Sequence, residues 1–313
     1  MVIEIIIYIL LGFGVIFALP STVYLFMFFG VFFRRQSLLL ESADLKNTQY
    51  EPYTERLKTD ILYAKQLAFE EITLTATDGI TLYGRYYKGK SDKLVILSHG
   101  YHASGFNNFA AILKDLLERG YNVLMIDQRG HGNSGGHFTT LGCKEQDDLQ
   151  LWIAYADEKN EIQDVLIYGI SMGSTTVGLA SDKIVSKKVK GLIMEAGFTC
   201  FYDELQWSLG TGSIKKMALS CIHLYSKAFL KTDIRQSTEE TLARNTLPVL
   251  FLHGDNDLEV PIEFTERNYH SCASKKEFIK VKGAGHTLCY IAGDASVRAA
   301  ILEFIDECTN NRK

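Results

Sequence analysis

The pattern of hydrophobic positions separates an N-terminal apolar run from the rest of the chain. Between Ile5 and Phe33 no residue is charged. A helix of about 20 apolar residues spans the hydrocarbon core of a bilayer, and this run is longer than that. The residues before the run include Glu4 but no Lys or Arg, whereas a secretory signal peptide begins with basic residues. We therefore expect residues 1–35 to form an uncleaved membrane anchor.

Pro20 and the basic residues after the run bear on how such an anchor would be placed. Pro20 would kink a single membrane helix or divide it into a hairpin. The apolar run could instead be a signal peptide or a core helix of a soluble protein. Arg34, Arg35 and Lys46 follow the run, and such residues are enriched on the cytoplasmic side of membrane helices. This predicts a single-pass protein of the cell membrane whose remaining residues are cytoplasmic.

A polar connector follows at residues 36–69. Leu57, Ile61, Ala64 and Leu67 recur in it at helical spacing. This spacing predicts a short amphipathic helix that lies against the following domain.

The remaining residues, 70–313, show the pattern of an α/β domain. Two alternating runs flank the turn Asp78-Gly79, which predicts an antiparallel hairpin, and Gly84 in the second run marks a bulge or a close backbone approach. Six further runs are typical of strands: Lys93–Ser98, Tyr121–Asp127, Asp164–Gly169, Lys190–Glu195, Pro248–His253 and Phe278–Val281. Most of them alternate with helical segments, which predicts a mostly parallel sheet with helices on both faces.

One long interval interrupts this alternation. Residues 201–245 contain no strand pattern, although strands are predicted on both sides of them. This predicts a small helical cap, at about residues 201–246, inserted into the α/β domain. Its aromatic and aliphatic side chains either pack the cap onto the sheet or line a pocket for an acyl or aromatic group.

Composition and charge exclude several classes of protein. Hydrophobic residues make up 47% and charged residues 22%, so a packed core is available and general disorder is excluded. A net charge of −4 gives no reason to expect a nucleic-acid partner. The six cysteines form no C-x-x-C pair, so neither a zinc site nor a disulfide framework is indicated.

A candidate nucleophile lies in the sequence Gly169-Ile170-Ser171-Met172-Gly173. This G-x-S-x-G motif follows a predicted strand and opens a predicted helix, which is the setting that gives it meaning. Small residues are needed on such a tight turn, and the helix N-terminus favours developing negative charge near Ser171. The backbone N–H of Met172, the residue after the nucleophile, is one expected donor to an oxyanion.

A serine hydroxyl also needs a base that is held by a third group. After the last predicted strand, a glycine-containing turn carries His286. After the strand before it, the sequence runs His253-Gly254-Asp255-Asn256-Asp257. Ser171 and both segments follow the carboxyl ends of strands, in the order serine, acid, histidine. We expect them to meet at one edge of the sheet.

These motifs resemble the α/β-hydrolase superfamily from about residue 70 to the C-terminus. More narrowly, the chain is similar to membrane-anchored members that are lipase/esterase-like or serine aminopeptidase-like. The resemblance places the catalytic acid on Asp257, with Asp255 and Glu195 as alternatives. It places the second oxyanion donor on Tyr101, in the loop His99-Gly100-Tyr101-His102.

A G-x-G-x-x-G pattern in residues 130–135 suggests a dinucleotide site only superficially. At least two predicted strands precede it, and the acids about 20 residues further on, Asp147 and Asp148, lie on a predicted helix instead of ending a strand. The run Asp127–Gly135 also resembles a loop motif of the hydrolase family. We therefore expect no dinucleotide, no other cofactor and no metal.

Together these features predict a serine hydrolase that cleaves a carboxylic ester or thioester through an acyl-enzyme. The expected partners are a small-molecule or lipid-like acyl substrate and a lipid bilayer. Amide hydrolysis by a serine peptidase or aminopeptidase is the alternative, because it uses the same groups. A catalytically idle, membrane-anchored binding scaffold, or a membrane-sensing module, is a different class that also remains open.

Overall fold

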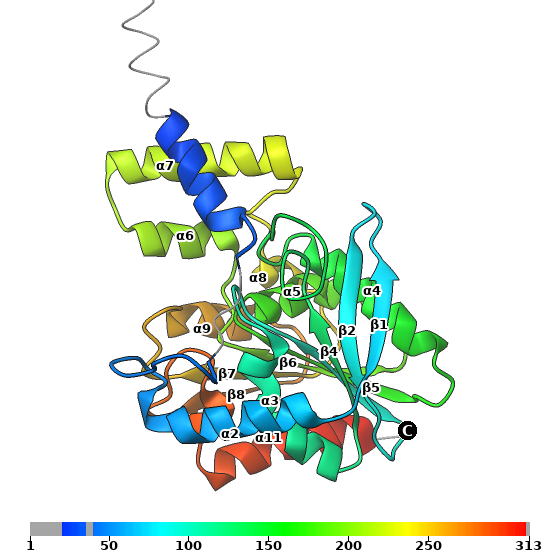
Figure 1. Ribbon diagram of the computed structural model, residues 1–313. Coiled ribbons are helices and arrows are strands. Elements are labelled where there is room, and N and C mark those ends of the chain that lie inside the picture. Colours follow the sequence, from blue (N-terminus) through cyan, green and yellow to red (C-terminus); the bar gives the residue numbers. More distant parts are fainter. Residues whose placement is uncertain (1–20, 36–39, 311–313) are drawn as a thin grey trace, which may run out of the picture.

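An eight-stranded sheet forms the centre of the computed structural model, which describes residues 21–35 and 40–310 (Figure 1). The strands are β1 (Glu70–Thr75), β2 (Thr81–Tyr87), β3 (Lys93–Ser98), β4 (Asn122–Asp127), β5 (Asp164–Ile170), β6 (Val189–Glu195), β7 (Val249–Gly254) and β8 (Lys276–Val281). They lie in the order β1-β2-β4-β3-β5-β6-β7-β8. The pairs β1–β2 and β2–β4 are antiparallel and the other neighbours are parallel. The predicted mostly parallel sheet is therefore confirmed.

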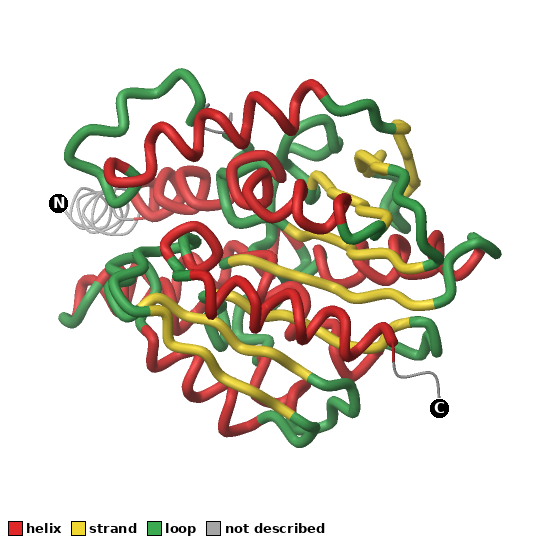
Figure 2. The backbone as a smooth tube through the Cα atoms, turned by 90° about the horizontal axis from the view of Figure 1, so that it is seen from below, coloured by secondary structure: helices red, strands yellow, loops and turns green. Residues whose placement is uncertain are grey.

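The helices account for most of the chain between these strands. Residues 21–32 are helical, and the named helices are η1 (Glu51–Tyr53), α2 (Thr54–Gln66), α3 (Gly105–Glu118), α4 (Glu145–Glu158), α5 (Met172–Ala180), η2 (Ser181–Lys183), α6 (Phe201–Leu209), α7 (Ser213–Tyr225), η3 (Ser226–Leu230), α8 (Thr238–Leu242), α9 (Ile262–Ser271), α10 (Cys289–Ala292) and α11 (Ala295–Asn310). Figure 2 shows helices on both faces of the sheet.

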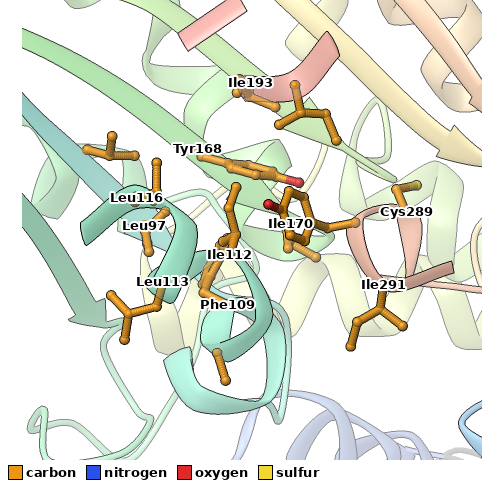
Figure 3. Close-up of a cluster of buried hydrophobic side chains, with 14 of the residues drawn as sticks. Leu97, Phe109, Ile112, Leu113, Leu116, Tyr168, Ile170, Ile193, Cys289 and Ile291 are labelled. Carbon is orange, nitrogen blue, oxygen red and sulfur yellow. The ribbon is translucent and has the colours of Figure 1, made fainter. Parts of the chain in front are cut away.

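Two hydrophobic clusters, one on each face of the sheet, form the core. Successive strand residues point to opposite faces, so Leu97 and Tyr168 enter the cluster beneath α3 and α11, whereas Ile96 and Ile167 enter the one beneath α4 and α5. Figure 3 shows part of the first cluster, in which α3 places Phe109 against Tyr168. The continuous apolar runs of the central strands follow from this burial on both faces.

The predicted connector helix and hairpin both form. The connector helix is α2, and it buries Leu57, Ile61 and Ala64. β1 and β2 pair across the Asp78-Gly79 turn. Gly84 marks a close approach: a Cβ atom there would lie 3.0 Å from the Trp152 ring and 3.1 Å from Leu124.

The predicted cap interval contains helices and no strand. In Figure 1, α6 and α7 stand above the end of the sheet, and the helix at residues 21–32 crosses them. Phe28 and Phe32 of that helix are fully buried in a third hydrophobic cluster, with Phe201 of α6 and Leu219 of α7 among its members. Phe32 O also accepts a hydrogen bond from the backbone N–H of Thr139 at 2.9 Å.

Most of the predicted membrane anchor falls outside the described residues. Residues 1–20, which make up most of the anchor, lie outside the residues that the structure describes, as do residues 36–39. Of the apolar run, residues 21–33 are described, and they lie against the cap. Among the residues that the structure describes, no helix is both long enough and apolar enough to span a membrane.

Candidate active site

Ser171 occupies the turn between β5 and α5. Its backbone has φ +55° and ψ −118°, a strained conformation for a residue with a side chain. The flanking glycines are required by close backbone contacts: a Cβ atom on Gly173 would lie 1.9 Å from Ser98 O, and one on Gly169 would lie 2.3 Å from Gly173 O. The G-x-S-x-G motif therefore specifies this turn by packing as well as by conformation.

The structure brings the three predicted side chains together. His286 Nε2 lies 2.9 Å from Ser171 Oγ, and His286 Nδ1 lies 2.7 Å from Asp257 Oδ2. Because an ionised carboxylate can only accept, Nδ1–H donates to Asp257 and leaves Nε2 to accept from the serine hydroxyl. Ser171 follows β5, Asp257 follows β7 and His286 follows β8, so all three lie at the carboxyl edge of the sheet.

Asp257 is held as a carboxylate by its surroundings. Its Oδ1 accepts hydrogen bonds from the backbone N–H groups of Glu259 and Val260, both at 2.9 Å. Its Oδ2 lies 3.2 Å from His253 Nε2. Burial alone would raise the pKa of Asp257, but the contacts to His253 and His286 hold this pKa well below its usual range.

The two alternative acids make other contacts. Asp255 is exposed, and its Oδ1 accepts from the backbone N–H of Gly283 at 2.6 Å. Glu195 is buried, and it accepts from the Tyr168 hydroxyl and, at 3.0 Å, from the backbone N–H of Cys289. Of the three candidate carboxylates, Asp257 is the one bonded to the His286 ring.

His286 has a raised pKa in this setting. Burial lowers the pKa of the imidazole, but the hydrogen bond to Asp257 and its negative charge raise it above the usual value. His286 is therefore a stronger base than a free histidine.

The loop that carries Tyr101 lies directly over Ser171. A Cβ atom on Gly100 would be 3.2 Å from Ser171 Cβ. The loop is fixed on both sides of Tyr101, because Gly100 N donates to Asn108 Oδ1 at 2.8 Å and His102 N donates to His131 Nε2 at 3.1 Å. The two predicted oxyanion donors, Tyr101 and Met172, thus belong to segments on either side of the serine.

The histidines around this loop have structural contacts. His99 is completely buried, its Nε2 accepts from Gln128 N at 3.1 Å, and burial lowers its pKa to about 4. His102 stacks on the Tyr101 ring with centroids 3.6 Å apart, and burial likewise lowers its pKa to about 4. Both are neutral near pH 7. The described residues contain no group of three or more His, Cys, Asp or Glu side chains arranged to hold a metal ion.

The G-x-G-x-x-G loop is held by ion pairs instead of opening a helix. Asp127 pairs with Arg85 at 2.9 Å, and Arg129 pairs with Asp148 at 2.6 Å and with Asp78 at 2.8 Å. The next helix, α4, begins at residue 145. The helix N-terminus that a dinucleotide pyrophosphate requires is therefore absent from this loop.

A cavity of about 560 Å³ opens onto Ser171 and His286. Its wall is largely apolar and includes Leu141, Phe198, Phe201, Leu205, Trp207 and Val260. Several of these side chains come from α6 and the segment before it, and the cap residues Phe201 and Leu205 both pack in the third hydrophobic cluster and line the cavity. Val31 and Tyr50, from the N-terminal part of the chain, also line the cavity.

Glu204 is an acidic side chain in this apolar wall. Its Oε1 accepts from Ser208 Oγ at 3.2 Å, whereas its Oε2 is buried without a hydrogen-bond partner among the described residues. Burial raises the pKa of Glu204 to about 7. No motif marks Glu204, because it follows Asp203 in the first turn of α6, where acidic residues are common.

Gln49 is a second residue that the motifs do not reveal. Its side-chain oxygen accepts from the backbone N–H of His286 at 2.6 Å, and its Nε2 donates to Glu259 Oε1 at 2.7 Å. It lies in the connector, among polar residues with no pattern that would distinguish it.

Comparison with known families identifies the superfamily of the chain. Residues 89–220 match the sequence model of the family described as "Serine aminopeptidase, S33", and residues 210–313 match the one described as "TAP-like protein". The chain belongs to the α/β-hydrolase superfamily. The relatives and the matching families support a hydrolase.

Individual relatives are distant. The chain is 27% identical over 258 residues to "Uncharacterized protein YqkD" of Bacillus subtilis, which covers 78% of this chain and 83% of that protein. It is 25% identical to "Lysophosphatidylserine lipase ABHD12" of Danio rerio, over 66% of this chain and 53% of that protein. Among solved structures, the Pyrococcus furiosus esterase Pf2001 has a TM-score of 0.63 at 21% identity, and covers 79% of this chain and 95% of its own. That likeness concerns the fold.

Proposed function

We propose that this α/β hydrolase cleaves a carboxylic ester or thioester, with Ser171 as nucleophile, His286 as general base and Asp257 as the acid that orients the base. The observation that carries the proposal is the hydrogen-bonded line from Ser171 Oγ through His286 to Asp257, with distances of 2.9 and 2.7 Å. This arrangement is the one that serine hydrolases use to activate a hydroxyl.

The mechanism follows from these positions. Asp257 fixes the imidazole tautomer, and His286 takes the serine proton as Ser171 Oγ attacks the substrate carbonyl. The backbone N–H groups of Met172 and Tyr101 stabilise the oxyanion, each contributing about 3 kcal/mol. His286 then protonates the leaving alcohol or thiol, and an acyl-enzyme remains. Water activated by the same histidine releases the acid.

The apolar cavity favours an apolar acyl group. Phe198, Phe201 and Leu205 offer surface to a hydrocarbon or an aromatic ring beside the serine. The names of two similar proteins, a lysophosphatidylserine lipase and an esterase, are in keeping with ester cleavage. The matching family described as a serine aminopeptidase keeps amide hydrolysis as the second candidate.

We also propose that the part of the N-terminal apolar run before residue 21 anchors the protein in the cell membrane, with residues 21–33 packed against the cap and the hydrolase domain on the cytoplasmic side. The support is the uncharged run from Ile5 to Phe33 and the Arg34-Arg35 pair that follows it. Labelling of an engineered surface cysteine in spheroplasts tests the side: a cysteine that a membrane-impermeant reagent reaches from outside contradicts a cytoplasmic domain.

A fluorophosphonate probe tests catalysis directly. We expect the native chain to be labelled and Ser171→Ala to remain unlabelled; equal labelling of both would exclude Ser171 as the nucleophile. A native chain without labelling would favour the binding scaffold. Rates on p-nitrophenyl esters of increasing acyl length, measured beside aminoacyl amides, then separate an esterase from a peptidase.

A further inference from the structure

Helix α7 is apolar on both of its faces. Ala218, Leu219 and Ile222 are buried toward the rest of the cap. On the other side, Ile214, Met217 and Leu224 have 73%, 48% and 62% of their surface exposed. These three positions recur at helical spacing, so they form one outward stripe. A surface helix of a soluble domain normally turns polar residues outward, and an apolar stripe of this kind marks an interaction surface.

The helix at residues 21–32 repeats this feature beside α7. It buries Tyr24, Phe28 and Phe32, whereas Val23 and Phe26 are 55% and 73% exposed. The helix contacts the cap through its own buried side: the Phe28 and Phe229 rings lie 5.8 Å apart, and Tyr225 Oη donates to Ser21 O at 3.2 Å. Figure 1 shows the two helices crossing at the top of the molecule, away from the sheet. We define the outer cap face as Val23 and Phe26 of this helix, Ile214, Met217 and Leu224 of α7, and Phe229 of η3, each at least 48% exposed.

The charges on these helices indicate what covers this face. Residues 21–35 and 210–232 contain no Asp or Glu. They contain the exposed Arg35 in the first segment and the exposed Lys215, Lys216, Lys227 and Lys231 in the second, of which Lys227 pairs with Asp233 at 2.9 Å. Apolar side chains bordered by cationic ones are the pattern of a surface that enters the headgroup region of an anionic bilayer.

The sequence before the helix points to the same occupant. Residues 5–20 carry no charge and lead directly into Ser21. An apolar segment of this length, joined without a linker to an exposed apolar helix, places the outer cap face next to wherever that segment is buried. We propose that the outer cap face lies in the interfacial region of an anionic lipid bilayer.

This placement gives the active site a route to a membrane-borne substrate. The catalytic cavity is lined by Val31 of the helix at residues 21–32, and by Trp207 and Ser208 of α6, which packs on α7. The helices of the outer cap face thus border the cavity. A substrate with an apolar acyl group can pass from the bilayer to Ser171 with little exposure of that group to water.

Tryptophan reporters test the proposal without any need for catalysis. The chain has two tryptophans, of which Trp152 is 1% exposed in the core and Trp207 is 48% exposed. The full chain carrying Trp207→Phe is reconstituted into vesicles of brominated phosphatidylcholine and phosphatidylglycerol. Leu224→Trp or Phe26→Trp then supplies a reporter on the outer cap face. The matched control is Val185→Trp. Val185 is 92% exposed and precedes β6, so it lies at the amino ends of the strands, whereas the cap lies at their carboxyl ends.

We expect bromine to quench the reporters at positions 224 and 26 and to leave the one at position 185 unquenched. Two reporters on different helices guard against one variant failing to fold. Equal quenching at all three positions, or none at positions 224 and 26, overturns the proposal. Lack of quenching together with emission that shifts to shorter wavelength as protein concentration rises would assign the face to a second copy of the chain. Fluorophosphonate labelling of the same samples reports separately on the proposed catalytic function.

Discussion

Gln49 accepts a hydrogen bond from the backbone N–H of His286 at 2.6 Å, although 237 positions separate the two residues in the chain. The same side chain donates to Glu259, two residues after Asp257, at 2.7 Å. One connector residue therefore ties together the loops that carry the histidine and the acid. Gly285 permits this approach, because a Cβ atom there would lie 2.3 Å from Gln49 Oε1.

Removing this tie is expected to lower turnover more than substrate binding. In Gln49→Leu the histidine loop loses its acceptor, and a displacement of about 1 Å in a reacting group costs up to about a hundredfold in rate. We expect kcat on a soluble ester to fall by about tenfold to a hundredfold with little change in KM. Gln163→Leu is the matched control, because the Gln163 side chain donates to Asn160 O in a distant loop.

Gln49→Glu distinguishes positioning from simple loss of packing. It keeps an acceptor for the His286 N–H, replaces the donor to Glu259 with a second carboxylate, and adds negative charge near the imidazole, which raises the pKa of His286. We expect the acid limb of the kcat/KM profile to move to higher pH, while Gln49→Leu leaves that limb near its native position. Identical pH profiles for the two variants would contradict a role for Gln49 at the histidine.

Asparagine replacements separate the neighbouring acids. Asp257→Asn leaves the shape of the site but favours the wrong imidazole tautomer, a change that costs about 10⁴ in kcat in serine proteases. Asp255→Asn keeps an oxygen that can accept from Gly283 N, leaves the bond between Asp257 and His286 intact, and is expected to keep most activity. Steady-state kinetics on one p-nitrophenyl ester decides the matter, and the opposite ranking of the two variants would transfer the role to Asp255.

The pH dependence of the native enzyme is expected to follow His286. Protonation of Nε2 removes the base, so kcat/KM falls as pH drops through the histidine pKa. Because Asp257 raises that pKa, Asp257→Asn should lower it and shift the acid limb to lower pH, with a reduced plateau. A pH–rate profile of both proteins provides the measurement; an acid limb that stays in place shows that another group controls it.

Glu204 is expected to make the fold less stable as pH rises. Its pKa is about 7 in the folded protein against an ordinary value of 4.5, so between these values the folded state binds more protons than the unfolded state. The free energy of unfolding is therefore highest below the unfolded-state pKa of Glu204. It declines as pH rises toward the folded-state pKa, by at most about 3 kcal/mol. We expect Glu204→Gln to remove this decline.

Denaturant unfolding at about pH 5 and about pH 8 measures the effect of Glu204. The native protein should lose stability between the two conditions relative to Glu204→Gln. Glu303→Gln, at an exposed position on α11, serves as control and should follow the native protein. Parallel behaviour of Glu204→Gln and the native protein would show that the Glu204 carboxyl is solvated.

Local patterns in the sequence determined the elements of this protein. Apolar runs such as Lys93–Ser98 become strands because both faces of the sheet are covered, and the 3.6-residue spacing of Leu57, Ile61 and Ala64 becomes the buried stripe of α2. The Ser171 turn is likewise local, since its glycines are required by atoms of the adjoining strand and helix. The sequence could therefore place the serine, the histidine and the edge of the sheet where they meet.

Tertiary structure decided which of the alternative distant groups touch. Asp255 and Asp257 are two residues apart and chemically identical, and only the path of the loop turns Asp257 toward His286. Gln49 reaches the histidine from a connector without periodicity, and Glu204 is raised in pKa by burial that no local pattern encodes. Side-chain chemistry and local backbone preference depend on residues that are neighbours in the sequence. Contacts between distant residues and the burial of side chains depend on the fold of the whole chain.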